Sequence, residues 1–298
     1  MNFKKITVAG SGILGYQIAF QSAFCGFNVT VYDINDEVLD KAKTKFASLS
    51  EAYTEDMQAT QAQLDVTAGN LRYTSDLADA VKDADLVIEA IPENPKIKID
   101  FYQKLGKVAP PKTIFVTNSS TLLPSQFAET TGRPEKYMAM HFANNIWKNN
   151  TAEIMRHSGT DPEVFDSVVS FAKDIRMVAI PIYKEQPGYI ISSLLTPFLA
   201  AGLELLVKDV ADYKAIDKAW MVGTKAPRGP FGMIDLAGAN TVYNICKMNA
   251  EKSGDPLQQK VVDYLKENLI DKGKLGITTG EGFYTYPNPA YLSDDFLK

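Results

Sequence analysis

Short runs of β-branched and other apolar residues alternate with longer amphipathic segments through the first part of the chain. The apolar runs predict strands over 4–9, 28–33, 71–73, 85–91, 113–118, 137–142, 152–157 and 177–183. The amphipathic segments predict helices over 13–25, 36–60, 95–108 and 161–174, with the long segment 36–60 expected to project as a helical pair. Because strands alternate with helices, we expect an α/β Rossmann-type domain whose mostly parallel sheet is covered on both faces.

The pattern changes near residue 184, beyond which no strand-like run occurs. Helical periodicity covers 188–208, 212–222, 236–252 and 256–270, and the residues 227–230 have the composition of a turn. We therefore predict a Rossmann domain over 1–184 and an all-α C-terminal domain over 185–298. The segment 188–207 carries the single charge of Glu204 and could span a bilayer by length alone, but we expect a buried helix of the helical domain.

Composition limits the possible partners. The 298 residues are 45% hydrophobic with a net charge of -5, which is typical of a globular protein and unfavourable for nucleic-acid binding. Cys25 and Cys246 show neither metal-binding nor redox spacing, so we expect two buried thiols and no metal site. The first strand follows Met1 almost directly, which favours a cytoplasmic location without a signal peptide or membrane anchor.

A glycine-rich turn follows the first predicted strand. The residues Gly10-Ser11-Gly12-Ile13-Leu14-Gly15 fit the pattern G-x-G-x-x-G between a strand and a helix. In this context the first glycine permits the tight turn, the second lets the backbone approach a pyrophosphate and the third allows close helix packing. The turn therefore predicts dinucleotide binding at the helix N-terminus.

An acidic residue ends the second predicted strand. Asp33 lies 18 residues after Gly15, where a carboxylate accepts hydrogen bonds from the adenosine ribose hydroxyls and repels a 2′-phosphate. The following Ile34-Asn35-Asp36 supplies no cation for such a phosphate. The sequence therefore predicts NAD rather than NADP.

A histidine and a carboxylate lie on two predicted strands further along. His141 lies near the end of one strand and Glu153 in the next, so neighbouring strands could bring them together. A carboxylate orients an imidazole and stabilises its charged form, which suits proton transfer coupled to hydride transfer. A structural histidine at a strand end is the alternative interpretation. His157, the second histidine, is expected to be structural or solvent-facing.

The stretch Asn118-Ser119-Ser120-Thr121 ends another predicted strand and should place its hydroxyls at the same edge of the sheet. A helix cap is the alternative role for these side chains.

Together these motifs resemble the L-3-hydroxyacyl-CoA dehydrogenase family over nearly the whole chain. The resemblance also rests on segments that match family signatures, namely Glu89-Ala90-Ile91-Pro92-Glu93-Asn94, His141-Phe142-Ala143-Asn144, Pro187-Gly188-Tyr189-Ile190, Gly229-Pro230-Phe231, and the final Gly280-Glu281-Gly282-Phe283-Tyr284.

The resemblance implies roles for several side chains. His141 would take the proton of the substrate hydroxyl, Glu153 would orient it, and Ser120 and Asn144 would hydrogen-bond the reacting oxygen or the nicotinamide. Glu93 and Lys98 would flank the cofactor, as would Ile13 and Leu14 in the glycine turn. It further implies a homodimer formed by the helical domains, and a place in fatty acid metabolism.

Departures from the family pattern concentrate on the substrate side. Asn145 replaces a proline, and Ser192 and Ser193 replace an asparagine and an arginine. The segment 50–56, which supplies a CoA-binding lysine in the family, is acidic here. Arg228 is an unusual cation in a turn expected to face the cleft.

Three hypotheses follow. The first is an NAD-dependent dehydrogenase that oxidises a short-chain 3-hydroxyacyl-CoA, such as 3-hydroxybutyryl-CoA, reversibly to the 3-ketoacyl-CoA. The second keeps the chemistry but replaces the substrate with a small free hydroxy acid or sugar acid anchored by Arg228. The third is a non-catalytic NAD-binding or structural protein on the same scaffold.

Overall fold

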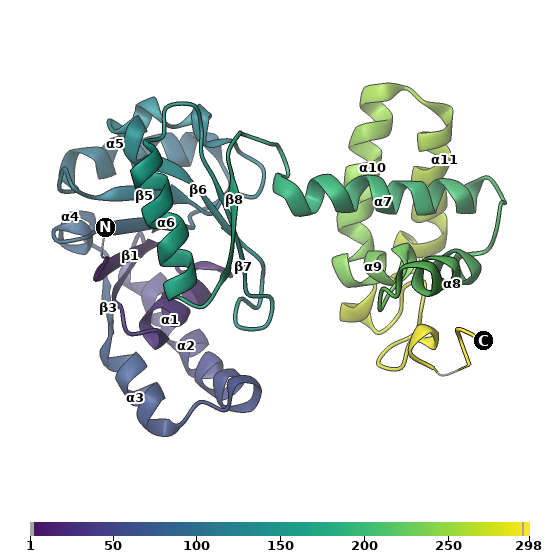
Figure 1. The fold of residues 1–298 in the computed structure, drawn as a ribbon, viewed down its shortest axis with the longest axis horizontal. Helices are drawn as coiled ribbons and strands as arrows, with labels where there is room; N and C mark the ends of the chain where they lie inside the picture. The colour runs from purple at the N-terminus through teal and green to yellow at the C-terminus, as the bar shows by residue number, and fades with distance from the viewer. Residues whose placement is uncertain (1–2, 294) are drawn as a thin grey trace. The chain divides into compact units, whose positions relative to one another are not determined.

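The computed structural model describes residues 3–293 and 295–298 (Figure 1). Contacts within the chain divide it into two compact units that meet at residues 190 and 191. The sequence pattern predicts a boundary a few residues earlier, near 184.

The N-terminal unit is built on a sheet of eight strands in the order β3-β2-β1-β4-β5-β6-β7-β8. The strands are β1 (Lys5–Ala9), β2 (Asn28–Tyr32), β3 (Leu71–Thr74), β4 (Leu86–Glu89), β5 (Ile114–Thr117), β6 (Tyr137–Phe142), β7 (Thr151–Met155) and β8 (Val178–Ile182). Neighbouring strands are parallel except for the antiparallel pair β6–β7. All eight predicted strands are present, and the mostly parallel Rossmann-type sheet is confirmed.

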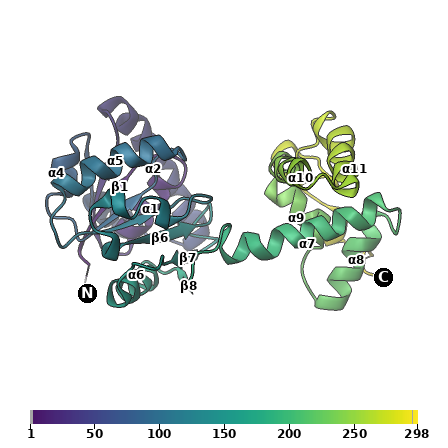
Figure 2. The same cartoon turned by 90° about the horizontal axis from the view of Figure 1, so that it is seen from above.

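Hydrophobic side chains cover both faces of this sheet. Along β4, Leu86 and Ile88 pack into the core that contains helices α1 (Gly15–Phe24), α2 (Asp36–Met57) and α6 (Pro162–Asp174). The intervening Val87 packs into a separate core with α4 (Leu77–Val81) and α5 (Pro95–Val108). Because alternate residues of a strand point to opposite faces, a strand buried on both sides is apolar throughout. Figure 2 shows α5 and α6 on opposite sides of the sheet.

The segment 36–60, predicted as a helical pair, contains one continuous helix, and the second helix lies just beyond the predicted range. The two helices are α2 and α3 (Gln61–Gly69). Asn35 caps the first helix by accepting a hydrogen bond from the backbone of Val38, and Thr60 forms a capping box with Gln63 at the start of the second.

The C-terminal unit is helical, as predicted. It contains most of α7 (Tyr189–Val207), followed by α8 (Tyr213–Thr224), α9 (Pro230–Ala237), α10 (Ala239–Ser253) and α11 (Pro256–Leu265). The helix predicted over 236–252 corresponds to α10, but its start was set too early and α9 was not predicted. Gly238, with a φ of +88°, separates the two helices. Pro230 occupies the first turn of α9, where its fixed φ favours a helix start and needs no amide donor.

Helix α7 is mostly uncovered in the single chain. It is the one helix in the described residues that is long and apolar enough to cross a membrane, and only 17% of its most apolar window is buried. The expectation of a helix buried within its own domain is therefore wrong. Leu194 is 70% exposed, whereas Leu199 and Leu203 pack into the core of the C-terminal unit.

Candidate active site

The glycine turn lies at the carboxyl end of β1, between that strand and α1. A Cβ on Gly15 would lie 1.8 Å from the backbone oxygen of Gly10, so only glycine permits this close approach. A Cβ on Gly12 would meet no atom within 4 Å. Protein packing therefore does not require a glycine at position 12, whereas the approach of a pyrophosphate to its amide does. Leu14 lines a neighbouring cavity, and Ile13 is 71% exposed at the surface of the turn.

Asp33 holds the same turn from the end of β2. Its Oδ2 accepts hydrogen bonds from the backbone amide of Ser11 at 2.7 Å and from the Ser11 hydroxyl at 2.6 Å, while Oδ1 accepts one from the amide of Ile34. Each carboxylate oxygen can accept more than one hydrogen bond, so the group can still receive a ribose hydroxyl. The turn and the carboxylate together fit NAD.

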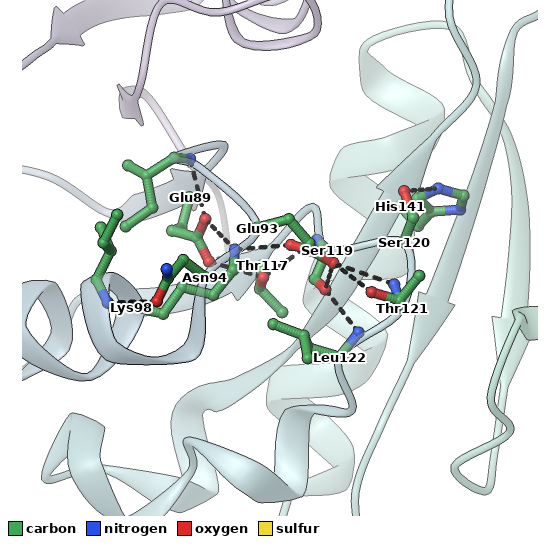
Figure 3. Close-up of polar contacts among 12 residues, drawn as sticks. Glu89, Glu93, Asn94, Lys98, Thr117, Ser119, Ser120, Thr121, Leu122 and His141 are labelled. Atoms are coloured by element: carbon green, nitrogen blue, oxygen red, sulfur yellow. Dashed lines mark hydrogen bonds and ion pairs between the residues drawn. The ribbon is translucent and has the colours of Figure 1, made fainter.

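His141 and Glu153 face each other across the antiparallel pair β6–β7, where they are direct register partners. The imidazole Nδ1 lies 3.3 Å from Glu153 Oε2, and Nε2 lies 3.1 Å from the hydroxyl of Ser120. Glu153 is almost completely buried, whereas the His141 side chain is 21% exposed. A carboxylate at Nδ1 stabilises the tautomer that carries the proton there and leaves Nε2 as the acceptor on the open side. Figure 3 shows Ser120 and His141 in contact.

Tyr189 completes the environment of the histidine within the N-terminal unit. Its ring stacks on the His141 imidazole with 4.6 Å between centroids and 21° between planes, and its hydroxyl donates a 2.6 Å hydrogen bond to the backbone oxygen of Ser119. The next amide, of Ile190, donates to Glu153 Oε1 at 2.9 Å. The two residues Tyr189 and Ile190 thus fix His141, Glu153 and the turn of residues 118–121, which we call the serine turn. Burial, with the negative charge of Glu153, raises the pKa of Tyr189 and keeps its hydroxyl protonated.

A buried polar network lies behind these residues at the ends of β4 and β5. Lys98 and Glu89, both 1% exposed, form an ion pair at 2.6 Å. The second oxygen of Glu89 accepts hydrogen bonds from Tyr102 at 2.9 Å and Thr117 at 2.7 Å. Because every oxygen of the buried carboxylate is occupied, this network forms a rigid floor to the site (Figure 3).

Glu93 connects this floor to the serine turn. It lies 3.3 Å from the ammonium of Lys98 and accepts hydrogen bonds from the hydroxyl of Ser119 and from the amide and hydroxyl of Thr121. Although partial burial raises the pKa of Glu93, the hydrogen bond from Ser119 and the charge of Lys98 bring it below the ordinary glutamate value. Glu93, Lys98 and Ser120 line one small cavity of about 180 Å³ with Leu14. The two residues expected to flank the cofactor therefore lie together, with Lys98 held by two carboxylates.

Asn144 is held by another partner. Its side-chain oxygen accepts a 2.8 Å hydrogen bond from Gln17 on α1, and Gln17 in turn accepts one from the amide of Asn145 at 2.9 Å. Asn145 has a φ of +57°. A proline could adopt neither this φ nor this donor role, so the departure from the family at position 145 belongs to a different turn. No hydrogen bond joins Asn144 to His141 or Ser120 among the described residues.

The remaining polar candidates are structural. His157 is buried and lies within hydrogen-bonding distance of the Pro134 oxygen and the Gly159 amide. Cys25 and Cys246 are free and partly buried, and burial raises the pKa of the Cys246 thiol to about 11. In the described part of the chain, no group of His, Cys, Asp and Glu side chains could hold a metal ion.

Sequence reasoning missed several residues that shape this site. The pairing of β4 with β5 makes Glu89 and Thr117 register partners, and Tyr102 reaches Glu89 from α5. No local sequence pattern predicts these contacts. Asn118 accepts a 3.0 Å hydrogen bond from the Phe142 amide and so ties β5 to β6. Tyr189 could have been noticed, because it carries a hydroxyl where the resembled motif P-G-F-I has phenylalanine.

The assembled groups can move a proton next to a dinucleotide site. The glycine turn after β1, the buried floor at the end of β4 and His141 near the end of β6 all lie at the carboxyl edge of the parallel strands, where open α/β sheets bind ligands. An oriented imidazole there can accept a hydroxyl proton while the nicotinamide accepts a hydride.

Comparison with known proteins agrees with this geometry. The NAD-binding domain of 3-hydroxyacyl-CoA dehydrogenases matches residues 5–186, and the C-terminal domain of the same enzymes matches residues 188–286. The mitochondrial hydroxyacyl-coenzyme A dehydrogenase of Rattus norvegicus is 32% identical over 95% of this chain and 91% of its own length. A probable 3-hydroxybutyryl-CoA dehydrogenase of Deinococcus radiodurans is 31% identical, over 95% of this chain and 100% of its own.

Among solved structures, a diketoreductase described as a dual catalyst of dicarbonyl compounds is 53% identical, with a TM-score of 0.90. The similarity covers 96% of this chain and 100% of that one. NAD is therefore the cofactor, and the chain is an oxidoreductase that belongs to the 3-hydroxyacyl-CoA dehydrogenase family.

Proposed function

We propose that this enzyme interconverts a ketone and a secondary hydroxyl that lies β to another carbonyl group, with NAD as the hydride carrier, in a small substrate without CoA. The observation that carries the chemistry is the chain of contacts from Glu153 through His141 to Ser120. Such a chain has no purpose in a non-catalytic NAD-binding protein.

The proton step follows from this geometry. In the oxidation, Nε2 of His141 accepts the hydroxyl proton of the substrate. NAD, which the glycine turn and Asp33 would hold, would supply the hydride acceptor when bound. In the reduction, the imidazolium returns that proton to the new alkoxide. Glu153 stabilises the imidazolium from Nδ1, while Ser120 can donate its hydroxyl hydrogen to the reacting oxygen.

The proposal that the substrate lacks CoA rests on two observations. The diketoreductase is 53% identical, whereas the relatives that act on acyl-CoA are 31–32% identical. The C-terminal part of α2 also carries Glu51, Glu55 and Asp56, and Lys148 and Trp147 at its end both bind Asp56. An acidic helix is an unfavourable support for the phosphates of CoA.

A short-chain 3-hydroxyacyl-CoA, such as 3-hydroxybutyryl-CoA, is the second candidate. It is supported by curated relatives that match 95% of the chain. Both candidates place the reacting hydroxyl β to a carbonyl, so the same catalytic residues serve either substrate.

The two candidates are separated by following NADH oxidation with 2,4-pentanedione and with acetoacetyl-CoA as ketone substrates. We expect a higher kcat/KM for the free diketone. A kcat/KM for acetoacetyl-CoA at least tenfold above that for the diketone would contradict the proposal and support the second candidate. His141→Ala should lower kcat/KM by about 10²- to 10⁴-fold for whichever substrate is used.

We also propose that the enzyme is a homodimer formed through its helical unit. The support is the uncovered apolar surface of α7, on which Ile191, Leu194 and Leu205 are exposed. Monomeric proteins rarely leave so much contiguous apolar surface in water, and a second copy of the same helix can cover it.

A further inference from the structure

Arg228 lies in the C-terminal unit, in the turn immediately before α9. Its Nε is completely buried and has no hydrogen-bond partner in the structure. No salt bridge of its guanidinium occurs within residues 3–293 and 295–298 either. Burying an N–H of a cation without an acceptor is costly, so such a group is a strong indication of a missing partner.

The Arg228 side chain borders a cavity of about 450 Å³. Its other lining residues come from the C-terminal tail of the same unit and are Ile277, Gly280, Tyr286, Pro287, Pro289, Tyr291 and Leu292. None of these other residues is charged. The cavity therefore combines one cationic donor with an apolar and aromatic wall, which is the usual composition of a small-molecule site.

The nearby carboxylates have other partners. Asp217 accepts hydrogen bonds from the amides of Phe231 and Gly232 and from Tyr284. Asp235 accepts them from the amides of Phe283 and Tyr284 and from Tyr286. Burial raises the pKa of both Asp217 and Asp235. Neither group neutralises Arg228, which is left for an external acceptor.

The chemistry of the site selects the class of that acceptor. The two Nη groups of a guanidinium offer N–H donors side by side, in a geometry that binds both oxygens of a carboxylate. One guanidinium balances the single negative charge of a carboxylate, whereas it leaves one of the two charges of a phosphate monoester uncompensated. The apolar wall suits a short carbon skeleton.

We propose that the cavity beside Arg228 is a binding site for a small carboxylic acid, with the carboxylate on the guanidinium and the carbon skeleton against Tyr286, Tyr291 and Leu292. The acid binds as a ligand of the C-terminal unit. The proposal does not depend on the reaction proposed above.

Isothermal titration calorimetry with (S)-3-hydroxybutyrate tests the site, with the uncharged methyl (S)-3-hydroxybutyrate as the control ligand. We expect the wild-type protein to bind the acid more tightly than the ester. Arg228→Met should weaken binding of the acid by about tenfold or more while leaving the ester unchanged. Lys260→Met is the matched control, because it removes the same charge from an exposed position outside the cavity and should bind the acid as the wild type does.

A second variant tests the site independently, in case Arg228→Met does not fold. Ile277→Asp changes a 39% exposed lining residue and places a negative charge in the cavity, where it repels the ligand or occupies Arg228. It should also weaken binding of the acid. Equal affinity of wild type, Arg228→Met and Ile277→Asp for the acid, or no binding of the acid to the wild type, would overturn the proposal.

Steady-state kinetics in the same variants separates binding at this cavity from turnover. We expect the calorimetric loss in Arg228→Met to occur with the KM for (S)-3-hydroxybutyrate unchanged. Binding without turnover of the acid or its methyl ester would count against the proposed function and leave this site intact.

Discussion

At the scale of single residues, the environment of His141 is set by two neighbours with different tasks. Glu153 fixes the imidazole through Nδ1, and Tyr189 covers its face while tying down the turn that carries Ser120. The position of Nε2 relative to a substrate oxygen therefore depends on a tyrosine that need not touch the substrate. Tyr189 is a positioning residue.

Tyr189→Phe should lower kcat while leaving the KM for NAD unchanged. The substitution keeps the stacked ring but removes the donor to the Ser119 carbonyl, so the Ser120 hydroxyl is less firmly placed against the histidine. We expect a loss of about threefold to tenfold in kcat, corresponding to the roughly 1 kcal/mol of one hydrogen bond. Tyr183→Phe, at a 64% exposed position, is the control, and a kcat equal to that of the wild type in Tyr189→Phe would refute the positioning role.

Glu93 should make part of the stability depend on pH. Its pKa is lower in the folded protein than in the unfolded chain, so the unfolded state binds more protons around the ordinary glutamate pKa. The contribution is thus fully present above that value and is lost as the pH falls through the folded pKa. The difference in unfolding free energy between wild type and Glu93→Gln, measured by urea denaturation from pH 7 down to pH 3, should shrink with falling pH. A constant difference would show that the charge of Glu93 has no part in stability.

The pairing of His141 with Glu153 was predicted from the sequence, but the residues that surround this pair were not. His141 and Glu153 were predictable because two successive strands carry them, and neighbouring strands in the chain are commonly neighbours in the sheet. The floor formed by Glu89, Lys98 and Tyr102 was not, because its members meet only when α5 packs on β4. Asn144 was expected at the reacting oxygen or the nicotinamide. In the structure it accepts a hydrogen bond from Gln17 instead, because of a local turn that the sequence pattern does not predict.

At the scale of elements, the turn between β1 and α1 contains two glycines that are needed for different reasons. Gly15 is required by packing, since its Cβ would overlap a backbone oxygen, whereas the space around Gly12 is open. The strand pattern made this element predictable, because an apolar strand, a glycine turn and a helix lie in direct succession. The C-terminal helix α9 was missed for the opposite reason: its first residues, Pro230-Phe231-Gly232, have the composition of a turn.

Gly12→Ala and Gly15→Ala should therefore fail in different ways. Gly12→Ala should unfold at the wild-type temperature, because the added methyl meets no protein atom, but its KM for NAD should rise by about tenfold or more as the pyrophosphate loses its close approach. Gly15→Ala should lose about 2 kcal/mol or more of stability from overpacking. Thermal unfolding and NAD titration distinguish the two, and a wild-type KM for NAD in Gly12→Ala would contradict the role assigned to that glycine.

At the scale of the whole molecule, α7 is the feature that the single chain leaves unexplained. Its apolar residues are too numerous for a helix facing water, and the proposed partner is a second copy. The residue pattern led us to expect burial within one chain, because hydrophobicity does not indicate which chain supplies the covering surface. The resemblance to the family implied instead that a dimer would bury this helix.

Leu194→Lys should dissociate the dimer. The side chain is 70% exposed in the single chain, so the lysine should be tolerated by the folded monomer but not within an apolar interface. Val66→Lys, at a 62% exposed position on α3 in the N-terminal unit, is the matched control. Sedimentation velocity should give a monomer for Leu194→Lys and a dimer for the control and wild type; a monomeric wild type would refute the proposed assembly.

The central claim is that His141, oriented by Glu153, transfers the proton that accompanies hydride transfer. The most direct measurement is the kcat/KM for NADH-dependent reduction of 2,4-pentanedione by wild type, His141→Ala, Glu153→Gln and the exposed control Glu163→Gln. We predict that kcat/KM falls by about 10²- to 10⁴-fold in both His141→Ala and Glu153→Gln and is unchanged in Glu163→Gln. The affinity for NADH should be the same in all four proteins. Wild-type turnover by His141→Ala, in a protein that still binds NADH, would contradict the account.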